Sequence, residues 1–190
     1  MWCYKLLPDL LDIPGDIQQR ILIESRAESQ IQNPHVLGSS HGRLLYKENQ
    51  ELYGRSTAFV NRSVSAEIET WAKENITDCY LRVSTCSTDP GFDHSGPHRD
   101  QSRDFVLIYL LTTGGDQAVT RFWNLKIPSE LKNYYSDYNE LTLVDELKSR
   151  PYQWYIMDTK KIHSVENINQ GRTSLQISLT RDHVTNLKFL

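Results

Sequence analysis

The hydrophobic positions of this chain change their period part-way along its length. Within the first 77 residues, one apolar stripe at helical spacing runs through residues 14–28. A second stripe is clearer in residues 64–76, with Ser63 before it as a candidate N-cap. Its apolar face consists of Val64, Ile68, Trp71, Ala72 and Ile76. The pattern therefore predicts two helices in the amino-terminal part of the chain.

After Asp78 the period becomes two, and short β-favouring runs alternate with turn clusters. Strands are predicted at residues 79–86, 105–111, 118–123, 152–157, 163–167 and 173–180. Short strands joined by tight turns favour an antiparallel barrel or jelly roll, with the early helices packed outside it. We expect one domain over residues 1–190: helical support over 1–77, a jelly-roll core over 78–182, and an insertion at 127–151.

The predicted insertion is polar and rich in tyrosine, and two interpretations stay open. It is either a surface loop with a short helix near residues 144–148, or part of the mouth of a site together with residues 88–97. The second interpretation offers four aromatic side chains as walls: Trp123, Tyr134, Tyr135 and Tyr138.

Composition narrows the class of protein. The net charge of −3 and the lack of a basic run disfavour nucleic acid as a partner. With 38% hydrophobic residues and a mean hydropathy of −0.54, the chain is typical of a water-soluble globule, so no membrane association is expected. Cys3, Cys79 and Cys86 form no CxxC pair and no secretion signal precedes them, which predicts reduced thiols and a cytoplasmic location. No oligomeric state is predicted.

Candidate metal ligands lie in two segments. His98 and Asp100 are separated by one residue in an extended stretch, so both side chains project to the same side. His163 opens a later predicted strand. Two imidazoles and one carboxylate are typical of non-haem Fe(II) oxygenases, because three coordination positions stay open. Zinc is the rival metal, although no separate catalytic base for a hydrolytic zinc site is apparent.

The last predicted strand alternates cleanly between apolar and polar side chains. One face carries Leu175, Ile177 and Leu179; the other carries Arg172, Ser174, Gln176 and Ser178. The polar face either meets solvent or lines a pocket. In a pocket, the planar guanidinium fork of Arg172 suits a carboxylate, and the Ser174 hydroxyl can add a second hydrogen bond. That pair would hold a dicarboxylate.

His98-x-Asp100, His163 and Arg172-x-Ser174, in this order on β-rich sequence, resemble the Fe(II)- and 2-oxoglutarate-dependent oxygenase superfamily. The resemblance covers roughly residues 80–180 and is greatest to prolyl-hydroxylase-like and aspartyl/asparaginyl-hydroxylase-like members. It implies a double-stranded β-helix, a cupin-like jelly roll that is mainly β with flanking helices.

The resemblance also implies a site and a reaction. The iron ligands would be His98, Asp100 and His163, while Arg172 with Ser174 would hold the far carboxylate of 2-oxoglutarate and O2 would take the last position. Tyr109, on the strand after the metal motif, is a further candidate: depending on the strand register, it either donates to 2-oxoglutarate or points outward.

The implied reaction is hydroxylation of a C–H bond, with release of succinate and CO2. Halogenating members of the superfamily lack the carboxylate ligand, so Asp100 indicates hydroxylation. The expected substrate is an amino-acid-like small molecule or a peptidyl residue. The alternative is a non-catalytic jelly-roll module that senses a metal or a 2-oxo acid.

Overall fold

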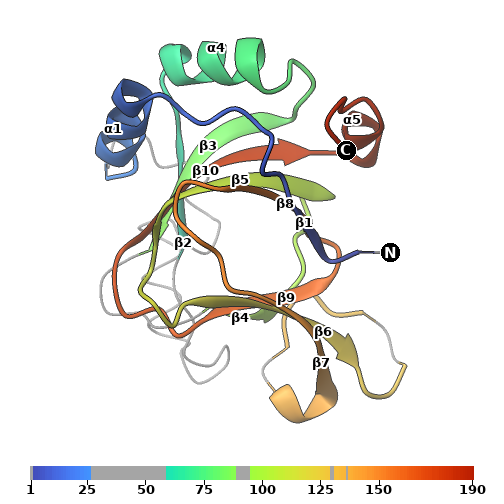
Figure 1. The fold of residues 1–190 in the computed structure, drawn as a ribbon. Helices are drawn as coiled ribbons and strands as arrows, with labels where there is room; N and C mark the ends of the chain where they lie inside the picture. Colours follow the sequence, from blue (N-terminus) through green and yellow to red (C-terminus); the bar gives the residue numbers. More distant parts are fainter. Residues whose placement is uncertain (1, 27–58, 89–94, 129–130, 136) are drawn as a thin grey trace.

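Two antiparallel sheets lie face to face in the computed structural model, which describes residues 2–26, 59–88, 95–128, 131–135 and 137–190 (Figure 1). The larger sheet has the order β1 (Tyr4–Leu6), β8 (Trp154–Asp158), β5 (Phe105–Thr113), β10 (Arg172–Leu179), β3 (Arg82–Thr88) and β2 (Phe59–Ser63). The smaller sheet has the order β4 (Ser95–His98), β9 (Ile162–Glu166), β6 (Val119–Leu125) and β7 (Leu141–Leu147).

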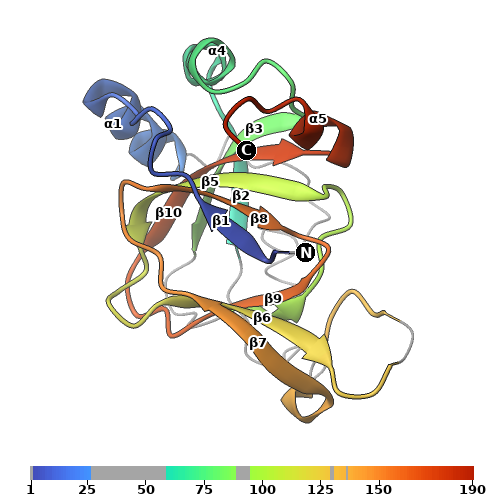
Figure 2. The same cartoon turned by 45° about the vertical axis from the view of Figure 1, so that its right-hand side comes forward.

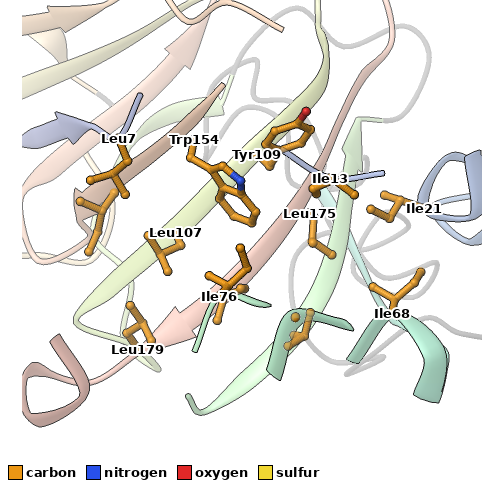
Figure 3. Close-up of a cluster of buried hydrophobic side chains, with 14 of the residues drawn as sticks. Leu7, Ile13, Ile21, Ile68, Ile76, Leu107, Tyr109, Trp154, Leu175 and Leu179 are labelled. Atoms are coloured by element: carbon orange, nitrogen blue, oxygen red, sulfur yellow. The ribbon is translucent and has the colours of Figure 1, made fainter. Parts of the chain in front are cut away.

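Helices cover the outer face of the larger sheet. Helices α1 (Gly15–Glu24) and α4 (Ala66–Asn75) lie over this face, and the short α5 (Arg181–Thr185) follows β10 on the same side (Figures 1 and 2). Beneath them is a cluster of buried apolar side chains in which Ile21 and Ile68 are fully buried (Figure 3). The helices therefore stabilise the larger sheet by burying its outer face.

Strand β5 shows why the run Phe-Val-Leu-Ile-Tyr-Leu-Leu is apolar at every position. Its residues Leu107, Tyr109 and Leu111 belong to the cluster under the helices. Val106, Ile108 and Leu110 belong to a second cluster between the two sheets. A strand buried on both faces needs apolar side chains at successive positions, because neither face meets water.

All six predicted strands are present, with bounds that differ by a few residues. The N-cap of α4 is Ser65, not Ser63, because Ser63 is the last residue of β2 and pairs with Ser84. The amino-terminal part is also less helical than predicted, since β1 and β2 join the larger sheet.

Two strands in the second half of the chain were not predicted, β4 and β7. The prediction of a short helix near residues 144–148 is wrong, because residues 141–147 form strand β7 and pair with β6. The cysteines are free thiols, as predicted, and burial raises the pKa of Cys86 to about 11. No helix in the described ranges has the length and apolar character needed to cross a bilayer.

Candidate metal centre

The three predicted metal ligands converge at one end of the smaller sheet. His98 at the end of β4 pairs directly with His163 on β9, so the two imidazoles lie on the same face, with ring centroids 4.4 Å apart. Asp100 follows two residues later, and its Oδ1 lies 3.7 Å from His98 Nε2. One ligand atom from each residue lies within 4.8 Å of the others, a spacing that one metal ion could bridge.

Backbone carbonyls orient both imidazoles. His98 Nδ1 lies 2.8 Å from the carbonyl oxygen of Gly96, and His163 Nδ1 lies 2.9 Å from that of Lys161. A carbonyl oxygen only accepts, so each Nδ1 must carry the hydrogen. Each Nε2 therefore keeps its lone pair for a metal. Hydrogen bonds of this kind commonly hold the imidazoles of metal sites in the required tautomer.

Burial and neighbouring charges set the protonation of the group. Burial lowers the pKa of His163 to about 4, with His98 acting in the same direction and Asp100 opposing it. Burial alone would raise the pKa of the Asp100 carboxyl, but Arg103 and both histidines outweigh it and hold that pKa well below its usual range. At neutral pH the site therefore offers a neutral His163 and an ionised carboxylate, the forms that bind metal.

The donor set fits a ferrous ion. Two nitrogens and one carboxylate oxygen suit an iron that keeps further positions for other ligands. Within the described ranges, this is the only group of at least three His, Cys, Asp or Glu side chains that could share a metal ion.

The polar face of β10 lies in the interior and not at the surface. Arg172, Ser174, Gln176 and Ser178 are all buried, and the last three pair with the β5 residues that point between the sheets. Of the two open interpretations of this face, solvent exposure is therefore wrong.

A guanidinium and a phenol meet on this interior face. Arg172 Nη1 donates to the Thr113 carbonyl oxygen at 2.6 Å, and its Nη2 donates to the Tyr155 hydroxyl at 3.4 Å. Ser174 Oγ donates to the Cys86 carbonyl oxygen at 3.4 Å. Two of the groups thus point to one place where a carboxylate could accept hydrogen bonds: the Arg172 guanidinium and the Tyr155 hydroxyl.

Tyr109 does not lie with this group, which corrects the expectation that it contacts 2-oxoglutarate. In β5 it pairs with Leu175, on the face under the helices, and its ring packs 5.1 Å from that of Trp154 (Figure 3). Gln18 Nε2 lies 3.5 Å from its hydroxyl. Burial and Asp12 raise the pKa of this phenol to about 12. The alternation of the pleat turns Tyr109 away from the interior.

Tyr155 is the tyrosine that sequence reasoning missed. It pairs with Ile108 on the interior face of β8, whereas its neighbour Trp154 points to the helix-covered face. The predicted strand at residues 152–157 contained it, but every residue of β8 is buried, so the apolar pattern carried no sign of which face is inside.

The insertion brings one of its candidate wall residues to the metal centre. Tyr134 forms a β-bridge with His98, and the two rings stack with centroids 6.0 Å apart. Trp123 and Tyr135 are buried in a separate cluster. Tyr138 donates to Glu166, on the β9 face opposite His163. Only Tyr134 among the four aromatics thus lies beside the triad; of the other predicted mouth segment, residues 89–94 are outside the described ranges.

Comparison with known proteins places this arrangement in a known fold. No family model matches the chain, and no curated protein is similar to it in sequence. A Trichoplax adhaerens prolyl hydroxylase, solved with a peptide fragment of hypoxia-inducible factor, is 8% identical, with a TM-score of 0.53 over 96% of this chain and 86% of that chain.

The non-heme epimerase SnoN of nogalamycin biosynthesis depends on α-ketoglutarate, another name for 2-oxoglutarate. It is 11% identical, with a TM-score of 0.51 over 93% of this chain and 78% of that chain. At these low identities the similarities show the fold alone. The antiparallel two-sheet topology agrees with that fold. The chain therefore has the double-stranded β-helix fold of 2-oxoglutarate-dependent oxygenases.

Proposed function

We propose that this protein is an Fe(II)- and 2-oxoglutarate-dependent dioxygenase that hydroxylates a C–H bond of an amino-acid-like small molecule or of a residue in a peptide. The observation that carries the proposal is the convergence of His98, Asp100 and His163 in the fold of such enzymes. The prolyl hydroxylase of the same fold was solved with a peptide, which supports a peptide as one of the two substrate classes.

The polar side chains of the site each have a role in this proposal. His98 and His163 bind iron through Nε2 and Asp100 through a carboxylate oxygen, and bound iron with 2-oxoglutarate and O2 would supply the oxidation that releases succinate and CO2. The Arg172 guanidinium and the Tyr155 hydroxyl bind the far carboxylate of 2-oxoglutarate. This charge-assisted pair would fix the orientation of the cosubstrate.

Ser174 contributes less than Arg172 and Tyr155 to binding the carboxylate of 2-oxoglutarate. Its hydroxyl already donates to the Cys86 carbonyl oxygen and accepts from Gln176 Nε2, each at 3.4 Å. Both contacts are long, so a nearby carboxylate would compete well for the hydroxyl proton. Ser174 thus supplements the Arg172 and Tyr155 donors.

The apolar ring of Phe122 would exclude water from one side of the proposed metal site. Phe122 is fully buried between the sheets, and its ring centroid lies 6.4 Å from the ring centroid of His163. Exclusion of water strengthens the interactions of the charged groups that remain and protects reactive species from side reactions.

The test of the proposal is spectroscopic. Anaerobic addition of Fe(II) and 2-oxoglutarate should produce the weak visible charge-transfer band of the chelate. His98→Ala should abolish the band, whereas His183→Ala, on α5 at the outer side of the larger sheet (Figure 1), should leave it unchanged. A band of equal strength in His98→Ala would contradict the proposal.

Succinate formation in air then separates an enzyme from the alternative, a non-catalytic sensor. Free amino acids and short peptides can be screened for stimulation of succinate release. A chelate band without any succinate, across the whole screen, would favour the sensor.

A further inference from the structure

We propose that Arg103 is a positioning residue that reserves one oxygen of Asp100, so that the carboxylate binds the metal through its other oxygen alone. This inference rests on the proposed function, because it concerns the denticity of a metal ligand. Arg103 is not one of the predicted site residues, yet it makes the shortest polar contact of Asp100.

The two carboxylate oxygens of Asp100 have different partners. Arg103 Nε donates to Oδ2 at 2.6 Å. Oδ1 points to the histidines and lies 3.7 Å from His98 Nε2. A charge-assisted bond of this length is strong in a partly buried pair, and here the side chains of Arg103 and Asp100 are 14% and 18% exposed. The oxygen free to bind a metal is therefore Oδ1.

The far side of the guanidinium is anchored to β10. Arg103 Nη1 donates to Gln176 Oε1 at 2.8 Å and to Ser178 Oγ at 3.4 Å. The polar face of β10 thus has two parts: Arg172 and Ser174 face the proposed cosubstrate site, while Gln176 and Ser178 hold Arg103.

Backbone hydrogen bonds hold the same loop in place. The buried Thr159 accepts from the Asp100 N–H at 3.0 Å and donates its hydroxyl to the Arg103 carbonyl oxygen at 2.9 Å. Arg103 and Asp100 are therefore fixed relative to each other at the backbone as well as at the side chain. A side chain held at both ends cannot follow Asp100 into a different ligand geometry without breaking several hydrogen bonds.

The number of Asp100 oxygens that bind the metal matters, because the proposed reaction requires three free coordination positions on the ion. A carboxylate can bind a metal through one oxygen or through both. With two imidazoles and one oxygen bound, three positions of an octahedral ion stay open, enough for the two donor atoms of 2-oxoglutarate and for O2. A bidentate Asp100 would occupy one of these three.

Manganese(II) provides a readout that does not depend on turnover. Line broadening of the Mn(II) electron paramagnetic resonance signal in ¹⁷O-labelled water counts the water ligands of the bound ion. The wild-type protein and Arg103→Met are compared, each loaded with Mn(II) alone. Arg121→Met is the matched control, because Arg121 also binds a carboxylate through Nε, at 2.9 Å from Glu146, but on the face of β6 opposite the triad.

We expect Arg103→Met to keep Mn(II) with one water ligand fewer than the wild type, and Arg121→Met to match the wild type. An unchanged count would overturn the inference. So would one additional water ligand, since that result would mean that Asp100 leaves the metal.

Arg103→Leu is the second variant if Arg103→Met does not fold, and the same loss of one water ligand is expected, because leucine also has no donor for Oδ2. Failure of a folded Arg103 variant to bind Mn(II) would also overturn the inference, because it would assign Arg103 to metal retention. If the wild type itself binds no Mn(II), the proposed function fails, and this outcome is distinguishable from a failure of the inference alone.

Discussion

At the scale of single residues, the face of a strand decides the role of a side chain. Tyr109 and Tyr155 are both buried tyrosines on neighbouring strands of the larger sheet. Tyr109 packs under the helices against Trp154, whereas Tyr155 contacts Arg172 between the sheets. Chemically identical side chains therefore have different proposed roles, one in packing and one in binding.

The proposed cosubstrate site predicts graded losses of affinity. Arg172→Leu should weaken 2-oxoglutarate binding by about 100-fold or more, and Tyr155→Phe by roughly 10-fold, because each removes donors to a charged group worth about 1.5–3 kcal/mol. Titration calorimetry of the Mn(II)-loaded protein measures both. Mn(II) affinity should be unchanged, since neither side chain contacts the metal ligands.

Tyr109→Phe is the matched control for these variants. It removes a hydroxyl of the same kind on the other face of the sheet, so 2-oxoglutarate affinity should equal that of the wild type. Weaker binding in Tyr109→Phe than in Tyr155→Phe would contradict the proposed site.

His163 predicts how the stability of the metal-free protein depends on pH. Burial lowers its pKa from 6.5 to about 4 in the folded state. The unfolded chain then binds more protons than the folded one between these values, so stability is fully present above about pH 6.5 and is lost as pH falls towards 4. The loss is at most about 3–4 kcal/mol, since one pKa unit corresponds to about 1.4 kcal/mol.

Urea unfolding in the presence of a chelator, from pH 7.5 to 4.5, measures this dependence. His163→Asn should flatten the profile, because the variant has no group that titrates in this window at that position. Parallel profiles for the two proteins would show that the acid lability comes from other groups.

At the scale of elements, the proposed metal site lies where an insertion meets the short strand β4. Backbone hydrogen bonds join the Arg99 N–H to the Asn133 carbonyl oxygen and the Tyr135 N–H to the Pro97 carbonyl oxygen, both at 2.9 Å. The insertion therefore adds a strand-like edge next to His98. Alternation along this edge sends Tyr134 towards the imidazole and Tyr135 into a buried cluster.

This alternation predicts opposite effects for two adjacent substitutions. Tyr134→Ala should raise the substrate KM with little change in stability, because Tyr134 is 50% exposed beside His98. Tyr135→Ala should instead lower the free energy of unfolding by about 3–5 kcal/mol, as is usual for a buried aromatic ring. Steady-state succinate assays and urea unfolding measure the two effects, and unchanged kinetics in Tyr134→Ala would remove Tyr134 from the site.

At the scale of the whole molecule, two clusters of apolar side chains have different roles: one stabilises the scaffold, and the other lies beside the proposed site. One lies between the helices and the larger sheet, and the other lies between the sheets, where Phe122 is next to His163. Helices α1 and α4 lie over the outer face of the larger sheet (Figure 2), whereas His98 and His163 belong to the smaller sheet, so we expect the helices to stabilise the scaffold.

This division predicts that helix packing affects stability and leaves metal binding intact. Ile68→Ala on α4 removes a fully buried side chain and should cost about 2–5 kcal/mol. Ile23→Ala on α1, where the side chain is 63% exposed, should cost less than about 0.5 kcal/mol. Below the unfolding transition of each variant, Mn(II) affinity should match the wild type; a large loss in Ile68→Ala would show that the two clusters are coupled.

Much of the fold could be predicted from the local sequence pattern. Short β-favouring runs between turn clusters predicted six strands, because strand propensity and turn signals are local properties of the chain. Strand β4 was missed since Ser-Gly-Pro-His carries no alternation and its pairing with β9 is long-range. Strand β7 was missed because its central residues are exposed, so the segment reads as a polar loop.

The sequence by itself determined the residue types and their order: the His-x-Asp pair, the later histidine, and the alternating strand with Arg172 and Ser174. Only the tertiary structure decided which of these face one another. Pairing between β4 and β9 brings His98 to His163, and the register of β5, β8 and β10 selects Tyr155 over Tyr109 and places Arg103 between Asp100 and Gln176. The physical reason is that strand register is set by contacts between distant segments, and a shift of one residue exchanges the two faces of a strand.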